Sequence, residues 1–122
     1  EAQAVWARII AAPCLGQLHA FQRDWIDLAD AVAARDAPRM AALAARLLDT
    51  QPDLTRETRD YLLVAGMTGA LAAGKPAEAL ALWNRQESLL RSPPRPLLRL
   101  LRCHAGRGTS GDCASAFAAY AD

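Results

Sequence analysis

The sequence predicts an all-α fold, and three observations lead to this expectation. Of the 122 residues, 28 are alanine. Alanine recurs together with leucine and arginine, and all three favour helices because they lose little side-chain freedom there. β-Branched residues are scarce and never alternate with polar residues over the length of a strand, so no sheet is expected. Glycine and proline interrupt the helical stretches at similar intervals, which predicts helices joined by short turns.

Length and charge narrow the class further. A chain of 122 residues has the size of one domain and can bury about two-thirds of its unfolded surface. The formal net charge of +1 gives no electrostatic reason to expect nucleic acid or an anionic membrane as the main partner. No apolar run approaches the roughly eighteen residues that a membrane span needs, and residues 1–7 do not have the composition of a signal peptide.

The proline and glycine positions define the expected helix boundaries. Proline is favourable in the first turn of a helix, so Pro38 and Pro76 are expected near helix starts. Asp36 and Thr55 are expected N-caps, and Gly74 an expected C-cap. Seven helices are predicted between the breaks: 2–12, 18–35, 38–49, 55–73, 76–91, 97–105 and 113–121.

The chain also contains an internal repeat. Residues 36–41 align with residues 74–79 at an offset of 38, and these align with 111–116 at an offset of 37. Similarity at a fixed spacing of this size is typical of helical repeat arrays. We therefore expect a single domain with an N-terminal helix and turn in residues 1–21, followed by helical hairpins at 22–53, 54–92 and 93–122. The alternative is an irregular bundle of six or seven helices.

The segment 71–83, Leu-Ala-Ala-Gly-Lys-Pro-Ala-Glu-Ala-Leu-Ala-Leu-Trp, resembles a tetratricopeptide repeat. It has the turn glycine, the Glu-Ala-Leu that opens the second helix, and a bulky residue one turn later. The spacing is three or four residues longer than the family's 34, and Leu63 stands where Trp25 stands in the first hairpin. The resemblance covers residues 22–122 and implies three tetratricopeptide-like hairpins in a right-handed α–α superhelix. Its small residues at the hairpin crossings are Ala41, Ala79 and Ala116.

In tetratricopeptide proteins the first helix of each hairpin lines a concave groove that holds a peptide or partner helix. The resemblance therefore implies a protein or peptide as the partner. It also implies nine groove residues: Arg23, Asp27 and Asp30 in the first hairpin, Tyr61, Val64 and Thr68 in the second, and Leu98, Leu101 and Arg102 in the third. Binding of chaperone tails is not expected, because the groove lysines and asparagines that clamp two carboxylates are absent.

Cys103 and Cys113 flank the last predicted turn, so their side chains can face each other across it. A disulfide there would clamp the terminal hairpin and favour the periplasm or the exterior of the cell. The alternative is a pair of buried thiols in a cytoplasmic protein. Cys14 is expected to be a packed thiol.

The sequence does not predict catalysis, a metal or a cofactor. Cys103, His104, Cys113 and His19 lack the spacing of a zinc site, and neither histidine has a nearby nucleophile in a recognisable motif. Asp24, Asp27 and Asp30 fall on one helix face, where a solvated acidic stripe is favoured over paired acid–base carboxylates.

Arg95, Arg99 and Arg102 share the polar face of the predicted helix 97–105, where they form either a solvated surface or a contact for an acidic partner. The function expected from all of these features is a non-enzymatic protein-interaction module, part of a larger bacterial envelope protein or assembly. The alternative is a secretion chaperone or an accessory domain of a larger enzyme.

Overall fold

The computed structural model describes residues 20–51, 53–90, 94–106 and 113, and every element within this part of the chain is helical. The elements are α2 (Ala20–Ala33), α3 (Ala37–Thr50), α4 (Arg56–Ala72), α5 (Pro76–Gln86), the 3-10 turn η2 (Glu87–Leu89) and α6 (Pro96–Gly106). The all-α prediction is confirmed for these residues. The predicted helix 2–12, and all of the predicted helix 113–121 except Cys113, lie outside the described residues. No helix in the described ranges is long and apolar enough to cross a membrane.

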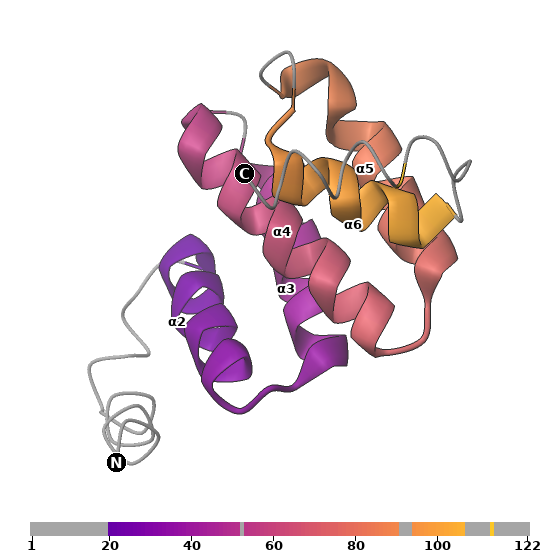
Figure 1. Cartoon of the computed structure of the whole chain (residues 1–122). Coiled ribbons are helices and arrows are strands. Elements are labelled where there is room, and N and C mark those ends of the chain that lie inside the picture. The colour runs from indigo at the N-terminus through magenta and orange to yellow at the C-terminus, as the bar shows by residue number, and fades with distance from the viewer. Residues whose placement is uncertain (1–19, 52, 91–93, 107–112, 114–122) are drawn as a thin grey trace.

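The helices pack in chain order around α4. α2 packs on α3, α3 on α4, and α4 on α5, while α6 lies across both α4 and α5 (Figure 1). The largest fully buried side chains come from four of these helices: Leu28, Leu47, Leu62, Leu63, Met67 and Leu98. The core is therefore built mostly from leucine, as expected from a chain in which 52% of the residues are hydrophobic but only 6% are aromatic.

The α2–α3 and α4–α5 connections use the same turn. Arg35 and Gly74 have positive φ angles of 55° and 75°. Directly after them, the amide of Asp36 donates to the carbonyl of Ala31 (2.9 Å) and the amide of Lys75 donates to that of Ala70 (2.8 Å). This is the bond pattern of a Schellman C-cap, which ends a helix and reverses the chain. Glycine adopts the left-handed conformation without strain, whereas Arg35 adopts it at a cost.

The interval between the two turns is one residue longer than the offset of 38 in the sequence alignment. Arg35 and Gly74 are 39 residues apart, and so are the first residues of α3 and α5. The difference arises because Pro38 is the second residue of α3 whereas Pro76 is the first residue of α5. Both prolines lie in the first turn of their helices, as predicted, but Ala79 corresponds to Met40 and not to Ala41.

Two glycines let α4 approach its neighbours closely. A Cβ atom on Gly69 would lie 2.7 Å from the carbonyl oxygen of Ala37 and 2.8 Å from the amide nitrogen of Ala41. A Cβ atom on Gly66 would lie 2.6 Å from Cδ2 of Leu82. α4 therefore touches α3 through Gly69 and α5 through Gly66. The close approach of Ala41 is to α4.

The predicted helix caps are present. Asp36 caps α3 by accepting a hydrogen bond from the amide of Arg39 (3.4 Å), and Thr55 caps α4 by accepting one from the amide of Thr58 (3.1 Å). The predicted helix 76–91 is shorter than expected, because its last turn tightens into η2 after Gln86.

Cys103 and Cys113 form a disulfide, with their Cα atoms 5.4 Å apart. Cys103 lies near the C-terminal end of α6 and is buried. The bond closes a loop with a sequence separation of 10 and holds residue 113 against α6. The predicted pairing is confirmed. Cys14 lies outside the described residues.

The contact at Gly69 predicts that Gly69→Ala destabilises the fold. The added methyl group would press on backbone atoms of Ala37 and Ala41, which cannot move as a side chain can. Overpacking should exceed the helix-propensity gain, so the free energy of unfolding should fall by about 1–2 kcal/mol in urea denaturation. Thr68→Ala is the control, because Thr68 is the exposed neighbour in the same helix. A Gly69→Ala protein as stable as this control would contradict the close approach.

The disulfide predicts that Cys103 and Cys113 resist alkylation in the unreduced protein and appear as one linked peptide in mass spectrometry. Reduction should lower the free energy of unfolding by about 2–3 kcal/mol, because it releases a short loop constraint on the unfolded chain. Cys103→Ser/Cys113→Ser should match the reduced wild type and should not respond further to reductant. Rapid alkylation of both thiols without reductant would rule out the bond.

Candidate functional site

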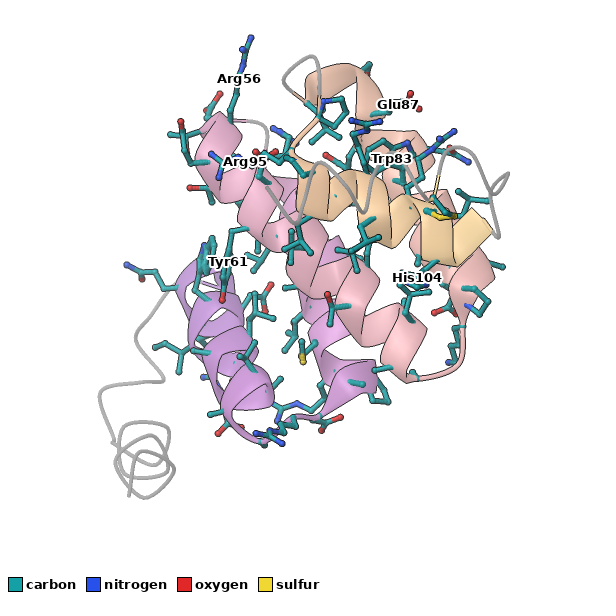
Figure 2. The ribbon with its side chains drawn as sticks, viewed as in Figure 1. Arg56, Tyr61, Trp83, Glu87, Arg95 and His104 are labelled. Carbon is teal, nitrogen blue, oxygen red and sulfur yellow. A yellow bond between two sulfur atoms is a disulfide. The ribbon has the colours of Figure 1, made fainter. Side chains whose placement is uncertain are left out.

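A groove runs between the N-terminal half of α4 and the start of α6. We call it the α4/α6 groove. Its volume is about 700 Å³, and it is lined by Glu57, Asp60, Tyr61, Val64, Arg95, Pro96, Leu97 and Leu98. Figure 2 shows Tyr61 and Arg95 toward the end of α4 that begins at Arg56.

The helical spacing of α4 brings four of these residues to one face. Glu57, Asp60, Tyr61 and Val64 occupy positions i, i+3, i+4 and i+7, which form a continuous stripe on an α-helix. The opposite wall is the first turn of α6, which begins at Pro96. Leu98 is fully buried and anchors this turn in the core, so the two walls are held by packing.

Tyr61 stands at the edge of the groove with 51% of its surface exposed. Its ring stacks on Trp25 of α2, with ring centroids 6.4 Å apart and planes at 21°. Stacking holds the ring while leaving much of its surface open. A rigid, amphipathic aromatic side chain of this kind loses little conformational entropy on binding and is common at interaction hot spots.

Asp60 is the unusual polar group of the groove. Its side chain is only 5% exposed, and Nε of Arg95 lies 2.8 Å from Oδ2. This contact lacks the alignment of a hydrogen bond, and among the described residues neither carboxylate oxygen accepts one. A buried carboxylate without hydrogen bonds is costly, because the protein does not replace the water that the group has lost. Arg95 therefore supplies charge to Asp60 but does not satisfy its oxygens.

The neighbouring residue, Arg59, is also buried but has a hydrogen-bond partner. Arg59 points to the other side of α4, where Nη1 donates to Oε1 of Gln86 on α5 at 2.8 Å. Both side chains are buried, so the bond ties α4 to α5 within the core. Of these two neighbouring residues, the one that faces the groove, Asp60, lacks hydrogen bonds from the described residues.

The groove brings together three of the nine residues predicted to line it: Tyr61, Val64 and Leu98. On α2, Arg23 is exposed and Asp27 is half-buried, and Asp30 pairs with Arg39 of α3 at 3.0 Å. Thr68 is exposed farther along α4, and Leu101 packs against the core. Arg102 lies over the ring of Trp83, 5.6 Å from its centroid, and so faces α5.

Sequence reasoning missed the other five lining residues, Asp60 and Arg95 among them. One signal was available for Asp60: it lies three residues before Leu63 and four before Val64, a spacing that places an acidic residue beside the apolar face of a helix. Arg95 was assigned only to the basic face.

Ion pairs account for much of the acidic stripe and the basic face. Asp24 accepts two hydrogen bonds from Arg46 of α3, one of them from Nε at 2.8 Å. This side-chain hydrogen bond raises the pKa of Arg46. Asp24 and Asp30 therefore join α2 to α3, and in the basic face Arg95 and Arg102 are both engaged within the fold.

A second, smaller groove of about 430 Å³ lies between α3 and α5. Its floor is made of small residues of α4, including Gly66 and Ala70. Arg85 on its rim already pairs with Asp49 of α3 at 3.5 Å. It lacks the exposed aromatic ring and the unsatisfied buried group that distinguish the α4/α6 groove.

Within the described ranges, no three His, Cys, Asp or Glu side chains are grouped so that they could hold a metal ion. Comparison with known proteins adds no assignment, since no family model, curated protein or solved structure matches the chain. The candidate site therefore depends on the geometry of the groove.

The contrast between Asp60 and Arg59 predicts opposite responses to leucine substitution. Asp60→Leu removes an unsatisfied carboxylate and leaves Arg95 half exposed to water, so the free energy of unfolding should rise by about 1–3 kcal/mol. Gln86→Leu is the matched change on the other side of α4, where it removes the acceptor of the buried Arg59. It should lower the free energy of unfolding by about 3 kcal/mol. Urea denaturation measures both, and equal destabilisation by both would show that Asp60 is well satisfied.

Proposed function

We propose that this domain is a non-enzymatic protein-interaction module that binds a peptide or a helix of a partner protein in the α4/α6 groove. The observation that carries the proposal is Tyr61, an exposed ring that stacks on Trp25 and lines the α4/α6 groove. Val64 and Leu97 continue the apolar surface from Tyr61 into the groove. An extended peptide or one face of a helix can cover such a surface.

The composition of the groove favours binding over catalysis. Among the described residues, its charged side chains are Glu57, Asp60 and Arg95, and none of the described lining residues is histidine, cysteine, serine or lysine. A nucleophile with an adjacent base is the usual requirement for covalent chemistry. The groove instead combines apolar side chains with the Asp60–Arg95 ion pair, a combination suited to binding a peptide or a helix of a partner protein.

We also propose that the helices form a tetratricopeptide-like array, with α2, α4 and α6 as the first helices of successive hairpins. Two observations support this: the same Schellman turn recurs at an interval of 39 residues, and α4 packs directly on α6. In such an array the first helices line the concave side, which is where the α4/α6 groove would lie.

The disulfide supports a location outside the cytoplasm. Cys103 and Cys113 are bonded, and structural disulfides persist mainly in oxidising compartments. We therefore infer that the domain works in the periplasm or outside the cell, as part of a larger envelope protein or assembly.

The proposal predicts that Tyr61→Ala weakens binding of a groove ligand. Peptides selected from a random displayed library on the immobilised domain would be synthesised and their Kd measured by fluorescence anisotropy. Loss of the Tyr61 ring should raise the Kd by about tenfold, because the ring is a preorganised anchor. Leu97→Ala should act in the same direction, since Leu97 lines the groove without belonging to the main core.

Leu89→Ala is the control for this experiment. Leu89 has the same exposed fraction as Tyr61, 51%, but lies on η2 outside the groove. Its substitution should leave the Kd unchanged. Circular dichroism would verify that each variant keeps its helicity. Selected peptides that bind all three variants as they bind the wild type would contradict the proposed site.

A further inference from the structure

We propose that the partner inserts a basic side chain into the α4/α6 groove, where it displaces Arg95 and becomes the hydrogen-bonded counterion of Asp60. This inference rests on the proposed function and specifies its ligand, a peptide segment in which a lysine or arginine is flanked by apolar residues. In the free domain Arg95 occupies the place of this basic side chain beside Asp60, and we call it a placeholder for that reason.

The first argument is the state of Asp60. Its carboxylate is nine-tenths buried and lines the groove, yet neither oxygen accepts a hydrogen bond from the described residues. An ammonium or guanidinium group inserted from the groove would provide the missing donors. Hydrogen bonds between charged groups are stronger than neutral ones, and a low-dielectric site strengthens them further.

The second argument is the weak hold of Arg95. Its side chain is 48% exposed, and its 2.8 Å approach to Asp60 does not have hydrogen-bond alignment. The half-exposed Arg95 regains hydration when it leaves, and the incoming basic group replaces its charge beside the buried Asp60, so the exchange should have a small net cost. The position of Arg95 also suits this role, because it lies immediately before the first residue of α6, at the mouth of the groove.

The third argument is the charge balance of the groove. Among the described lining residues, Glu57 and Asp60 contribute two negative charges and Arg95 one positive charge, which leaves a net charge of −1. One incoming basic group neutralises this charge. An acidic partner would have to bind beside two carboxylates, and the basic residue of the described lining, Arg95, is already paired with Asp60, so charge complementarity favours a basic ligand.

The apolar lining explains why the ligand should be a peptide and not a small free cation. Tyr61, Val64 and Leu97 offer apolar contact around the buried carboxylate. A side chain that delivers its charge to Asp60 would place its aliphatic stem, and its apolar neighbours in the peptide, against these residues. Lysine and arginine both combine a long apolar stem with a charged end.

The experiment uses the library-selected peptides as probes of the intact domain. Each arginine in a bound peptide is replaced by citrulline, and each lysine by norleucine, which keeps the size and removes the charge. One such replacement should weaken binding to the wild type at least about tenfold, because it removes the charged donor for Asp60. The same replacement should have little effect on binding to Asp60→Asn.

The decisive variant is Arg95→Gln. If Arg95 is a placeholder, its removal uncovers Asp60 and should tighten binding of the basic peptide by about three- to tenfold. Arg85→Gln is the matched control, since it removes the same charge from a side chain of similar exposure (50%) that pairs with Asp49 outside the groove. It should leave the Kd near the wild-type value. Weaker binding by Arg95→Gln would mean that Arg95 contacts the partner directly, and would overturn the inference.

A measurement on the wild type keeps the inference testable if a variant does not fold. The Nε–H signal of Arg95 in a proton–nitrogen NMR spectrum should shift when the peptide saturates the domain, because its contact with Asp60 is lost. An unchanged signal at saturation would overturn displacement. Peptides that depend on Tyr61 but not on any basic residue would overturn this inference alone. If no peptide binds, or if binding ignores Tyr61, the proposed function fails as well.

Discussion

The close contacts of α4 with α3 and α5 determine much of this fold. Gly69 lets the backbone of α4 meet the start of α3, and Gly66 leaves room for Leu82 of α5. With both neighbours drawn in, the core leucines Leu62 and Leu63 of α4 become fully buried. α6 then packs across α4 and α5 through Leu98. Three of the described helices, α3, α5 and α6, thus have extensive contact with α4.

α4 also contributes residues to the candidate site, and its two halves differ in composition. The C-terminal half carries the small residues that allow close packing, whereas the N-terminal half carries Arg59, Asp60 and Tyr61 in succession. The helical rotation of 100° per residue sends these three side chains in different directions. Arg59 enters the core toward Gln86, Asp60 faces the groove beneath Arg95, and Tyr61 reaches the ring of Trp25.

Several charged side chains of the described structure have well-formed contacts, and Asp60 differs from them. Arg46 holds Asp24 with two hydrogen bonds, and Arg102 covers the face of Trp83. Asp60 is buried more deeply than Asp24, yet none of the described residues donates a hydrogen bond to its oxygens. The other buried polar residues in the described ranges, Arg59 and Gln86, bond to each other, so Asp60 stands apart, and such local costs are typical of functional sites.

The sequence by itself determined the helical class and the turns, and it predicted the disulfide with a pair of buried thiols as the alternative. Local rules decide these features: Asp36 and Thr55 cap helices, Pro38 and Pro76 lie in first turns, and cysteines on either side of one turn can meet. Of the nine groove residues that the tetratricopeptide resemblance implied, three line the α4/α6 groove: Tyr61, Val64 and Leu98.

Tertiary structure decided the rest, since it depends on which helices meet. The repeat interval became 39 because Arg35 takes the left-handed position that Gly74 takes in the next turn. Arg102 turned to α5 because Trp83 offers a ring there. The pairing of Asp60 with Arg95 joins residues 35 positions apart on different elements, and its imperfect geometry is set by how α6 lies on α4. Spacing along one chain cannot specify such a contact, because it arises only when two helix faces are brought together.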